Sequence, residues 1–412
     1  MSAPYVPRLV DRVLGELLAD LPAVLVVGPR ACGKTTSAAR VCNGRLRLDR
    51  IDDLTAVRLD PDRAIARLEP VLIDEWQLEP AVLSAVKRSV DDEFRPGRFV
   101  LTGSARADMT TSGWPATGRV VRLDMWGLTV RELEGRIDTG GLVDRVVGDG
   151  VEVLLDGPPG QGVDDLVELA FRSGLPQAAL ARSERSRRSL LEGYVDQLVS
   201  RDAGSVAEID PLRLRRYLQA IASNTAGTPA HKLLYDAAQI DRQTALRYDS
   251  VLELVMAAEQ LPAWSSNRMA RLVQLPKRHL VDVSLLQTLV GVDARRARRD
   301  IDLLGRVLDS FVVAQLRPEV AVATNRHRLF HLRSANGRLE VDLLAELDDG
   351  RLIAIAVKAD RAPDAHAARH LATFRDLLPD RFAGGVVLHA GPNRYRISDR
   401  IVAAPISALW DP

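Results

Sequence analysis

The sequence has little that would support an extracellular or a membrane-bound fold. Only Cys32 and Cys42 among its 412 residues are cysteines, which excludes a disulfide framework and leaves too few thiols for a Cys₄ or Cys₂His₂ zinc site. The N-terminus shows no signal pattern, and no uninterrupted apolar run approaches the length that crosses a bilayer. We therefore expect a soluble protein of the reducing cytoplasm with no membrane contact.

A net charge is also nearly absent. Lysine and arginine number 56 against 55 aspartates and glutamates, so any nucleic-acid surface must be a local patch rather than a global field. Hydrophobic residues make up 46% of the chain. A chain of this length predicts about two to four domains, and this composition lets each of them bury a core.

One stretch carries a specific motif for phosphate binding. An apolar run over 24–27 ends at a glycine, and a second glycine, a lysine and a threonine follow at the G-x-x-x-x-G-K-[ST] spacing of a Walker A motif. Backbone N–H groups of such a loop cradle phosphates at a helix N-terminus. The sequence therefore predicts ATP and Mg²⁺ as ligands, with Lys34 on the β and γ phosphates and Thr35 on the metal. The expected nucleotide-binding residues are Gly28, Pro29, Arg30, Ala31, Cys32, Gly33, Lys34, Thr35 and Thr36.

A second apolar strand, predicted over 70–73, ends in two carboxylates. Asp74 and Glu75 at its end match a Walker B pattern. The first carboxylate of such a pair can hold the Mg²⁺ shell, and the second can orient and deprotonate the attacking water. We therefore predict Asp74 as a metal residue and Glu75 as the catalytic base.

Further candidates follow the next strands. The strand predicted over 99–101 runs into Thr102 and Ser104, and in parallel sheets ligands lie beyond the carboxyl ends of the strands. Either hydroxyl could sense the γ-phosphate, or both could merely cap a turn. Arg119, just before an apolar stretch over 120–123, is a candidate catalytic arginine finger, in cis or in trans from a second copy of the chain.

The order of these pieces resembles that of a known family. The motifs are Gly28-Pro29-Arg30-x-x-Gly33-Lys34-Thr35-Thr36, Ile73-Asp74-Glu75-Trp76-Gln77, Leu101-Thr102-Gly103-Ser104, and Gly118-Arg119 with Leu128-Thr129-x-Arg131-Glu132-Leu133. Together they resemble the prokaryotic AAA-type ATPases that carry an uncharacterised nuclease-like C-terminal domain. The resemblance implies an α/β fold, with an AAA-type doubly wound parallel sheet over 1–135. Frequent glycine from 135 to 162, with a loop over 156–162, predicts a lid or linker over 136–190.

The region 191–290 predicts a helical and winged-helix module. Helices are expected over 231–238 and after an N-cap at Asp241, followed by strands over 261–264 and 271–275. In a dedicated DNA-binding protein the second helix would enter the major groove, whereas beside an ATPase the same module often binds another domain or a partner protein. The residues that it would expose to DNA are Arg242, Gln243 and Arg247.

Two arginine clusters, over 182–188 and over 295–299, flank this module. Each is either a solvated face, a domain contact or a phosphate contact, and without interleaved aromatic residues base stacking is not indicated. The segment 276–282 matches a further Pro-Lys-x-x-x-x-Asp element of the same family and predicts the last strand of the module.

Residues 300–412 predict a small α/β domain that resembles the PD-(D/E)xK nuclease fold. In that fold an aspartate on one strand and a Glu-x-Lys on the next converge on Mg²⁺. Asp342 and Lys358 match this pattern, but Ala356 stands at the glutamate position. We therefore expect the domain to be degenerate, either DNA-binding or structural, rather than an active nuclease.

Other carboxylates could take the place of the missing glutamate as metal ligands. Asp309 lies at a helix position that often carries a glutamate, and Glu340 lies two residues before the matching aspartate. Unless Glu340 or Asp360 substitutes, Mg²⁺ would have too few protein oxygens there.

Three hypotheses follow from the sequence. The first is an ATP-hydrolysing, Mg²⁺-dependent AAA-type enzyme that binds DNA and is stimulated by it. The second is a nucleotide-gated switch with slow turnover that is read by a protein partner, without a DNA role. The third is a metal-dependent nuclease. A homo-oligomer is compatible with the first two.

Overall fold

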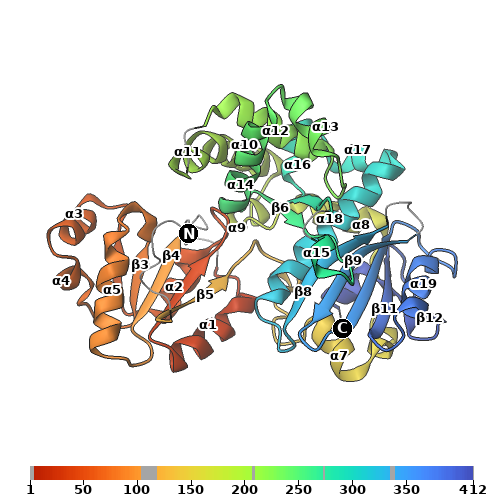
Figure 1. Cartoon of the computed structure of the whole chain (residues 1–412), viewed down its shortest axis with the longest axis horizontal. Helices are drawn as coiled ribbons and strands as arrows, with labels where there is room; N and C mark the ends of the chain where they lie inside the picture. Colours follow the sequence, from red (N-terminus) through yellow and green to blue (C-terminus); the bar gives the residue numbers. More distant parts are fainter. Residues whose placement is uncertain (1–3, 104–117, 207–208, 272–273, 335–338, 412) are drawn as a thin grey trace.

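The computed structural model describes residues 4–411 except 104–117, 207–208, 272–273 and 335–338. Figure 1 shows three parts: an N-terminal sheet with its helices, a helical middle part, and a C-terminal sheet at the opposite end of the long axis. The helices of the described residues include none that is long and apolar enough to cross a membrane.

The N-terminal sheet has five strands, all parallel, in the order β2-β3-β4-β1-β5. This confirms the prediction of a parallel α/β sheet. Its strands are β1 (Ala23–Val27), β2 (Gly44–Arg47), β3 (Val71–Asp74), β4 (Phe99–Gly103) and β5 (Val120–Asp124). The helices around it are α1 (Leu9–Asp20), α2 (Lys34–Val41), α3 (Ile51–Leu59), α4 (Pro61–Ile65), the 3₁₀ turn η1 (Trp76–Leu78) and α5 (Ala81–Asp92).

Alternate residues of β1 face opposite helical layers. Val24 and Val26 of β1 pack in one core with α1 and α2, whereas Leu25 packs in another with α3, α4 and α5. The strand is buried throughout, as expected for a parallel sheet that is covered on both faces.

The register of the strands places their carboxyl ends side by side at one edge of the sheet. Asp74 lies beside Thr102, and Val27 lies beside both Gly103 and Asp124. The loop that leaves β1 therefore starts between the ends of β4 and β5, with the end of β3 one strand further along, and parallel sheets bind ligands at this edge.

The chain between the two sheets is mainly helical. Its first elements are α6 (Val130–Leu133), α7 (Leu142–Asp149), η2 (Val151–Leu155), α8 (Val163–Arg172), α9 (Pro176–Ala179), α10 (Glu184–Gln197), the π-helical turn η3 (Leu198–Asp202) and α11 (Ala203–Val206). Next come α12 (Pro211–Ser223), α13 (His231–Ala238), α14 (Arg242–Leu254), β6 (Ala258–Leu261), α15 (Arg268–Arg271), β7 (Lys277–Leu280), α16 (Leu285–Val290) and α17 (Ala294–Arg299).

The expected helix pair of the winged helix is present as α13 and α14, but the expected strands are displaced. β6 and β7 pair antiparallel over 258–261 and 277–280, not over 261–264 and 271–275. The reason lies in Trp264, whose backbone N–H donates to the carbonyl of His331 at 2.7 Å and whose ring packs in the core of the C-terminal sheet. This segment therefore joins the C-terminal part instead of a wing.

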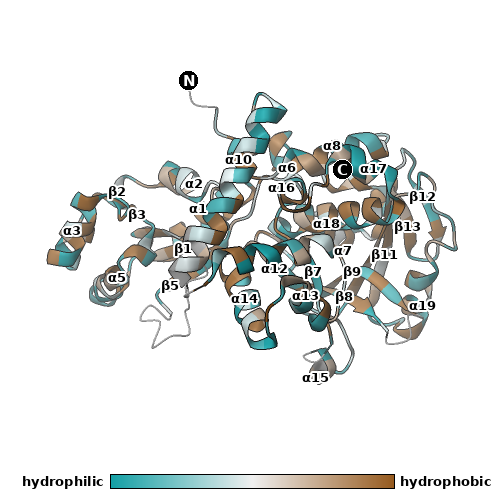
Figure 2. Cartoon of the chain, turned by 90° about the horizontal axis from the view of Figure 1, so that it is seen from above, coloured by the Kyte–Doolittle hydropathy of each residue, from teal (hydrophilic) through white to brown (hydrophobic). Residues whose placement is uncertain are grey.

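The C-terminal sheet is mixed, in the order β12-β13-β11-β10-β9-β8. Its elements are α18 (Ile301–Val320), β8 (His327–Arg333), β9 (Glu340–Leu347), β10 (Leu352–Lys358), α19 (Arg369–Leu377), β11 (Phe382–His389), β12 (Tyr395–Ser398), β13 (Ile401–Pro405) and η4 (Ile406–Leu409). α18 and α19 both pack against the sheet, and Figure 2 shows hydrophobic residues concentrated along α18 and the strands.

Within the segment 136–190, which the sequence predicts as a lid or linker, α7 and η2 pack on this C-terminal sheet. α7, η2 and α8 share a hydrophobic core with β10, β11 and β13, and a Cβ on Gly384 would lie only 2.2 Å from Cγ1 of Val151. The close approach of η2 to β11 is a contact between distant parts of the chain, which local sequence patterns do not reveal.

Candidate nucleotide-binding site

The loop between β1 and α2 is shaped by close backbone contacts. A Cβ on Gly28 would lie 2.0 Å from the carbonyl oxygen of Met125, so a larger residue does not fit where the loop leaves the strand. Gly33, with φ +103°, takes the left-handed conformation that favours glycine just before α2 begins. The loop therefore leads into the N-terminus of α2, where N–H groups and the helix dipole favour anions.

The ammonium of Lys34 lies inside this loop. Its Nζ donates to the carbonyl oxygens of Gly28 at 3.0 Å and of Pro29 at 2.9 Å, and the residue is buried. A buried cation at the start of α2, among the backbone groups of the loop, fits the phosphate-binding role expected for Lys34.

Two hydroxyl groups meet at the Asp74 carboxylate. Thr35 Oγ1 donates to Asp74 Oδ1 at 2.7 Å, and Thr102 Oγ1 donates to the same oxygen at 2.6 Å. Arg45 Nη2 lies 3.4 Å from the other carboxylate oxygen. Because Mg²⁺ prefers hard oxygen ligands, the pairing of Thr35 with Asp74 fits the metal-binding role expected for both.

The backbone at Glu75 is strained. Its φ of 58° and ψ of 45° are left-handed, a conformation that costs a non-glycine residue about 1–3 kcal/mol and clusters at functional sites. The half-buried carboxylate accepts a hydrogen bond from the side-chain amide of Gln77. This position directly after Asp74 suits the role of a general base expected for Glu75.

Thr102 is buried at the end of β4. Its hydroxyl bonds to Asp74, so its position favours orienting that carboxylate over the turn-capping role that the sequence left open. The other hydroxyl candidate, Ser104, lies outside the described residues.

Arg119 lies at the amino ends of the strands, whereas the phosphate-binding loop lies at their carboxyl ends. β5 runs parallel to β1 with Val120 opposite Ala23, so Arg119 precedes the strand at its amino end, and it pairs with Asp91 at 2.5 Å. A strand of five residues spans roughly 16 Å, too far for a direct contact with phosphates at the loop. This placement contradicts an arginine finger in cis, and only a role in trans remains as an expectation.

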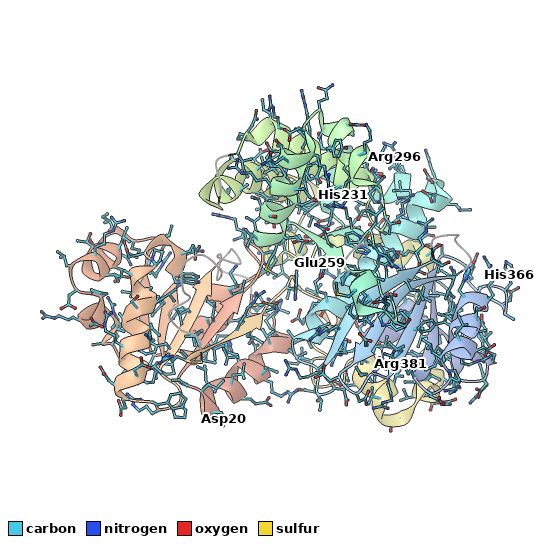
Figure 3. The ribbon with its side chains drawn as sticks, in the orientation of Figure 1. Asp20, His231, Glu259, Arg296, His366 and Arg381 are labelled. Carbon is cyan, nitrogen blue, oxygen red and sulfur yellow. The ribbon has the colours of Figure 1, made fainter. Side chains whose placement is uncertain are left out.

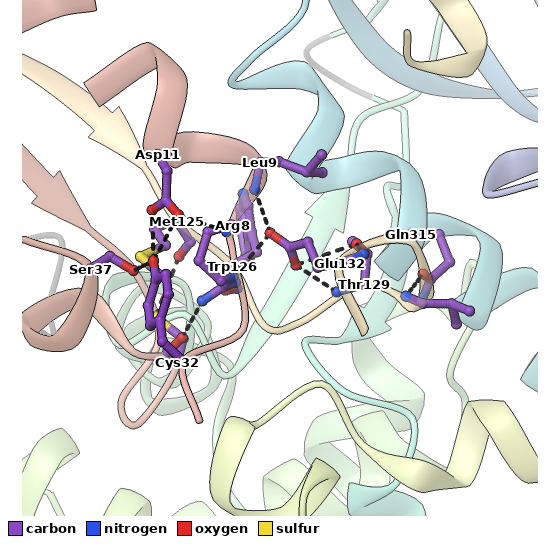
Figure 4. A network of polar contacts seen from close by, with 12 residues as sticks. Arg8, Leu9, Asp11, Cys32, Ser37, Met125, Trp126, Thr129, Glu132 and Gln315 are labelled. Carbon is purple, nitrogen blue, oxygen red and sulfur yellow. Dashed lines mark hydrogen bonds and ion pairs between the residues drawn. The ribbon is translucent and has the colours of Figure 1, made fainter. Parts of the chain in front are cut away.

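A side chain that the sequence did not single out supports the loop from behind. Arg8, which is 4% exposed, donates to the carbonyls of Cys32 at 2.8 Å and Trp126 at 2.7 Å, and to Glu132 Oε1 at 3.0 Å. Figure 4 shows this network. The guanidinium ties the phosphate-binding loop to the chain that follows β5.

Glu132 belongs to α6, which contacts α18. The backbone N–H of Val130 donates to Gln315 Oε1 at 2.8 Å, and Arg131 Nη1 lies 3.0 Å from Glu319 Oε1. Buried polar contacts thus run from the phosphate-binding loop through α6 to α18 of the C-terminal part (Figure 4). The only sequence signal for this path is the Thr129-x-x-Glu132 capping box, which locates the start of α6 but not its partners.

Two of the four nuclease-like candidates meet at a lysine that the sequence did not include among them. Asp309 of α18 and Asp342 of β9 meet at the ammonium of Lys277, which pairs with Asp309 and lies 3.5 Å from Asp342 Oδ1. Burial raises the pKa of Asp309 to about 7, against the opposing effect of the Lys277 charge.

The other two members flank this pair in more exposed positions. The backbone N–H of Val357, the residue before Lys358, donates to Asp342 Oδ2 at 2.9 Å, and, besides burial, the charge of Glu340 raises the pKa of Asp309. Lys358 lines a surface hollow together with Asp360 and His366, and Glu340 is exposed at the start of β9. Ala356, at the expected glutamate position, packs in the apolar core of the sheet. A single site made of all four residues stays a prediction.

The candidate DNA contacts are exposed on α14, as the sequence predicts. They are Arg242, Gln243 and Arg247.

The two arginine clusters that flank the expected winged-helix module come together in the structure, because Arg187 and Arg295 line one groove. Within that groove Arg298 is already paired with Asp164 and Glu168.

Three family models match consecutive parts of the chain. Residues 20–134 match an AAA domain, residues 163–296 match a domain of unknown function (DUF8612), and residues 304–409 match another domain of unknown function (DUF4143).

Similar proteins are known in two mycobacteria. Uncharacterized proteins of Mycobacterium bovis and Mycobacterium tuberculosis are each 28% identical to this chain over 408 residues, which cover 96% of this chain and 82% of each relative. Among solved structures, a Walker-type ATPase of Pyrococcus abyssi aligns at 15% identity with a TM-score of 0.38, over 68% of this chain and 94% of that one. The match at residues 20–134, together with the parallel sheet and its phosphate-binding loop, shows that this chain contains an AAA-type P-loop ATPase domain.

Proposed function

We propose that this chain binds ATP together with Mg²⁺ and hydrolyses the nucleotide. The observation that carries the proposal is the meeting of the Thr35 and Thr102 hydroxyls at one oxygen of Asp74, directly beside the loop that holds Lys34. These groups come from the ends of two strands and the start of one helix, and each is of the chemical type that nucleotide hydrolysis needs.

Different residues of the site bind the metal, bind the phosphates and activate the water. Thr35 and Asp74 would hold Mg²⁺, which neutralises phosphate charge when bound. Lys34 contacts the β and γ phosphates, and Glu75 orients the attacking water and accepts its proton. Thr102 holds the carboxylate of Asp74 in place.

Steady-state ATP hydrolysis by the full chain tests this proposal. Lys34→Ala should lose both ATP binding and hydrolysis, because it removes the positive charge from the phosphate site. Lys232→Ala is the matched control: its ammonium is exposed on α13, where it pairs with Asp236 and lies over the ring of Tyr235, both on the same helix. Hydrolysis by Lys34→Ala at the rate of the unaltered protein would overturn the proposal.

We further propose that DNA stimulates the hydrolysis of ATP. The support for this is positive charge on the protein surface. The exposed Arg242, Gln243 and Arg247 support it. Figure 3 shows Arg296 of the second arginine cluster on the outer side of the molecule, away from the N-terminal sheet. Hydrolysis rates with single-stranded DNA, duplex DNA and RNA at two salt concentrations test it, since contacts to phosphates weaken with salt. Stimulation that is lost in Arg242→Ala/Arg247→Ala would support a DNA role, and equal rates with and without nucleic acid would refute it.

A nucleotide-gated switch is the second candidate, and a specific observation favours it. The buried path from Cys32 through Arg8 and Glu132, and on from α6 to Gln315, links the phosphate-binding loop to the C-terminal part. A nucleotide that shifts the loop would therefore act on α18 as well. Slow hydrolysis that DNA does not change, together with nucleotide-dependent hydrogen exchange in α18, would favour this switch over the DNA-stimulated enzyme.

A further inference from the structure

Three charged groups from three distant segments meet at the junction of the middle part with the C-terminal sheet. Lys277 at the start of β7 is 5% exposed, and Asp309 in α18 is 7% exposed. The Lys277 ammonium pairs with Asp309 Oδ2, lies 3.5 Å from Asp342 Oδ1, and lies 3.4 Å from the backbone carbonyl of Asp342. One lysine thus faces two carboxylates that come from a helix and from a strand.

The acidic pair has more negative charge and more oxygen atoms than this lysine satisfies. Asp309 Oδ1 is buried and has no hydrogen-bond partner among the described residues. Asp342 Oδ2 accepts a hydrogen bond from the backbone N–H of Val357 at 2.9 Å, which leaves Oδ1 to face the ammonium. Buried oxygens without a partner are rare in proteins and indicate a position that could hold a further ligand.

The lysine is firmly seated in this position. The next residue, Arg278, is buried and forms a double ion pair with Asp249, at 2.5 and 2.7 Å. Its backbone also bridges to Gly227, and β7 pairs with β6 along its length. The backbone that carries Lys277 is therefore fixed, and the buried side chain starts from a position that directs its ammonium to the two aspartates.

We propose that the Lys277 ammonium is a built-in cation that occupies a divalent-metal position between Asp309 and Asp342. Mg²⁺ and Mn²⁺ are held by one or two carboxylates together with water, and Asp342 keeps partial access to solvent. Ala356 in the apolar core means that the neighbouring strand supplies no third carboxylate. The ammonium neutralises the two carboxylates in place of a metal ion. The domain therefore keeps this buried charged cluster but carries out no metal-dependent chemistry there.

Removal of the lysine should open the site to a divalent ion. We expect Lys277→Gln, which shortens the side chain by one atom, keeps it polar and removes its charge, to gain one Mn²⁺ site per chain, measured in the full chain without nucleotide by electron paramagnetic resonance. The double variant Lys277→Gln/Asp309→Asn should lose that gain. Lys277→Arg, which keeps the positive charge, should show no gain.

The protein with Lys277 intact provides a second arm that does not depend on how the lysine variants fold. With the ammonium in place, Asp309→Asn should leave Mn²⁺ stoichiometry unchanged. A drop in stoichiometry would show that metal binds beside Lys277 and would overturn the proposal. It would also be overturned if folded Lys277→Gln gained no Mn²⁺ site. These readouts need no nucleotide, so they stand or fall independently of the proposed ATPase activity.

Discussion

Arg8 and Glu132 form a buried ion pair, 3.0 Å from Nε to Oε1, across 124 positions of the chain. Both side chains are almost fully buried, at 4% and 2% exposed. The other two nitrogens of the guanidinium bond to the carbonyls of Cys32 and Trp126. The pair therefore fixes the phosphate-binding loop against the segment that connects the ATPase domain to the rest of the molecule.

Arg8→Ala should destabilise the protein and weaken ATP binding. Removing one partner of a buried ion pair leaves the other charge unpaired and costs about 3–5 kcal/mol, and the loop also loses its support at Cys32. Chemical unfolding and equilibrium binding of ATP measure the two effects. Arg12→Ala is the control, because Arg12 pairs with Glu16 on the exposed face of α1, where such pairs contribute about 0–1 kcal/mol. Equal stability of the two variants would show that the Arg8–Glu132 pair does not support the loop.

Thr102→Val should slow hydrolysis while ATP binding persists. The change removes the hydroxyl that donates to Asp74 at 2.6 Å but leaves Lys34 and the loop intact. Loss of a residue that orients a metal-binding carboxylate typically costs about 10- to 100-fold in activity or metal affinity. Thr102→Ser, which keeps the hydroxyl, should restore most of the rate. If valine and serine had the same effect, the hydroxyl would not be what matters.

Gly28→Ala should abolish nucleotide binding and destabilise the N-terminal domain. Its added Cβ would lie 2.0 Å from the Met125 carbonyl, which belongs to the backbone and cannot yield without moving the loop. Gly15→Ala is the matched control, since a Cβ there meets nothing within 4 Å on the exposed side of α1. In a helix that control substitution should stabilise the protein by about 1 kcal/mol. Retention of ATP affinity by Gly28→Ala would contradict the tight contact.

His331 should make the protein less stable in mild acid. Burial lowers its pKa from 6.5 to about 4, although a hydrogen bond with the Leu275 carbonyl acts the other way. Between these two values the unfolded chain binds a proton that the folded chain does not. This contribution to stability is therefore complete above pH 6.5 and is lost as the pH falls, by about 3 kcal/mol once the pH is below 4.

The measurement is the free energy of unfolding between pH 7.5 and 4 for the unaltered protein and for His331→Gln. The difference between the two profiles isolates the histidine from Asp309, whose raised pKa acts in the opposite direction. The profile of the unaltered protein should fall more steeply with acid. A matching change at the exposed His366 should leave the profile unaltered, and parallel profiles for His331→Gln would refute the prediction.

The nucleotide site was predictable because its signals are local. The spacing from Gly28 to Thr35 and the carboxylates after the strand of Asp74 each lie within a few residues. Parallel strand order then brings the two motifs together, as strand pairing shows for Asp74 and Thr102. A motif at the end of a buried strand thus predicts both its local structure and its place in the sheet.

Contacts between distant segments were not predictable in the same way. Trp264 leaves the expected wing because it pairs with His331 on another sheet. Lys277 lies in a segment that the sequence identified as a strand, yet its partners Asp309 and Asp342 come from α18 and β9. Their meeting depends on how three elements pack, and no pattern within any one of them carries that information.

The most direct test of the central claim is ATP turnover by Glu75→Gln, measured together with its affinity for ATP. A general base contributes about 10²- to 10⁴-fold to a rate. We therefore expect turnover to fall by at least about 100-fold, while ATP still binds because Lys34, Thr35 and Asp74 are unchanged. Turnover at the rate of the unaltered protein would contradict the assignment of Glu75 as the base, and the reading of this site as an ATP-hydrolysing centre would fall with it.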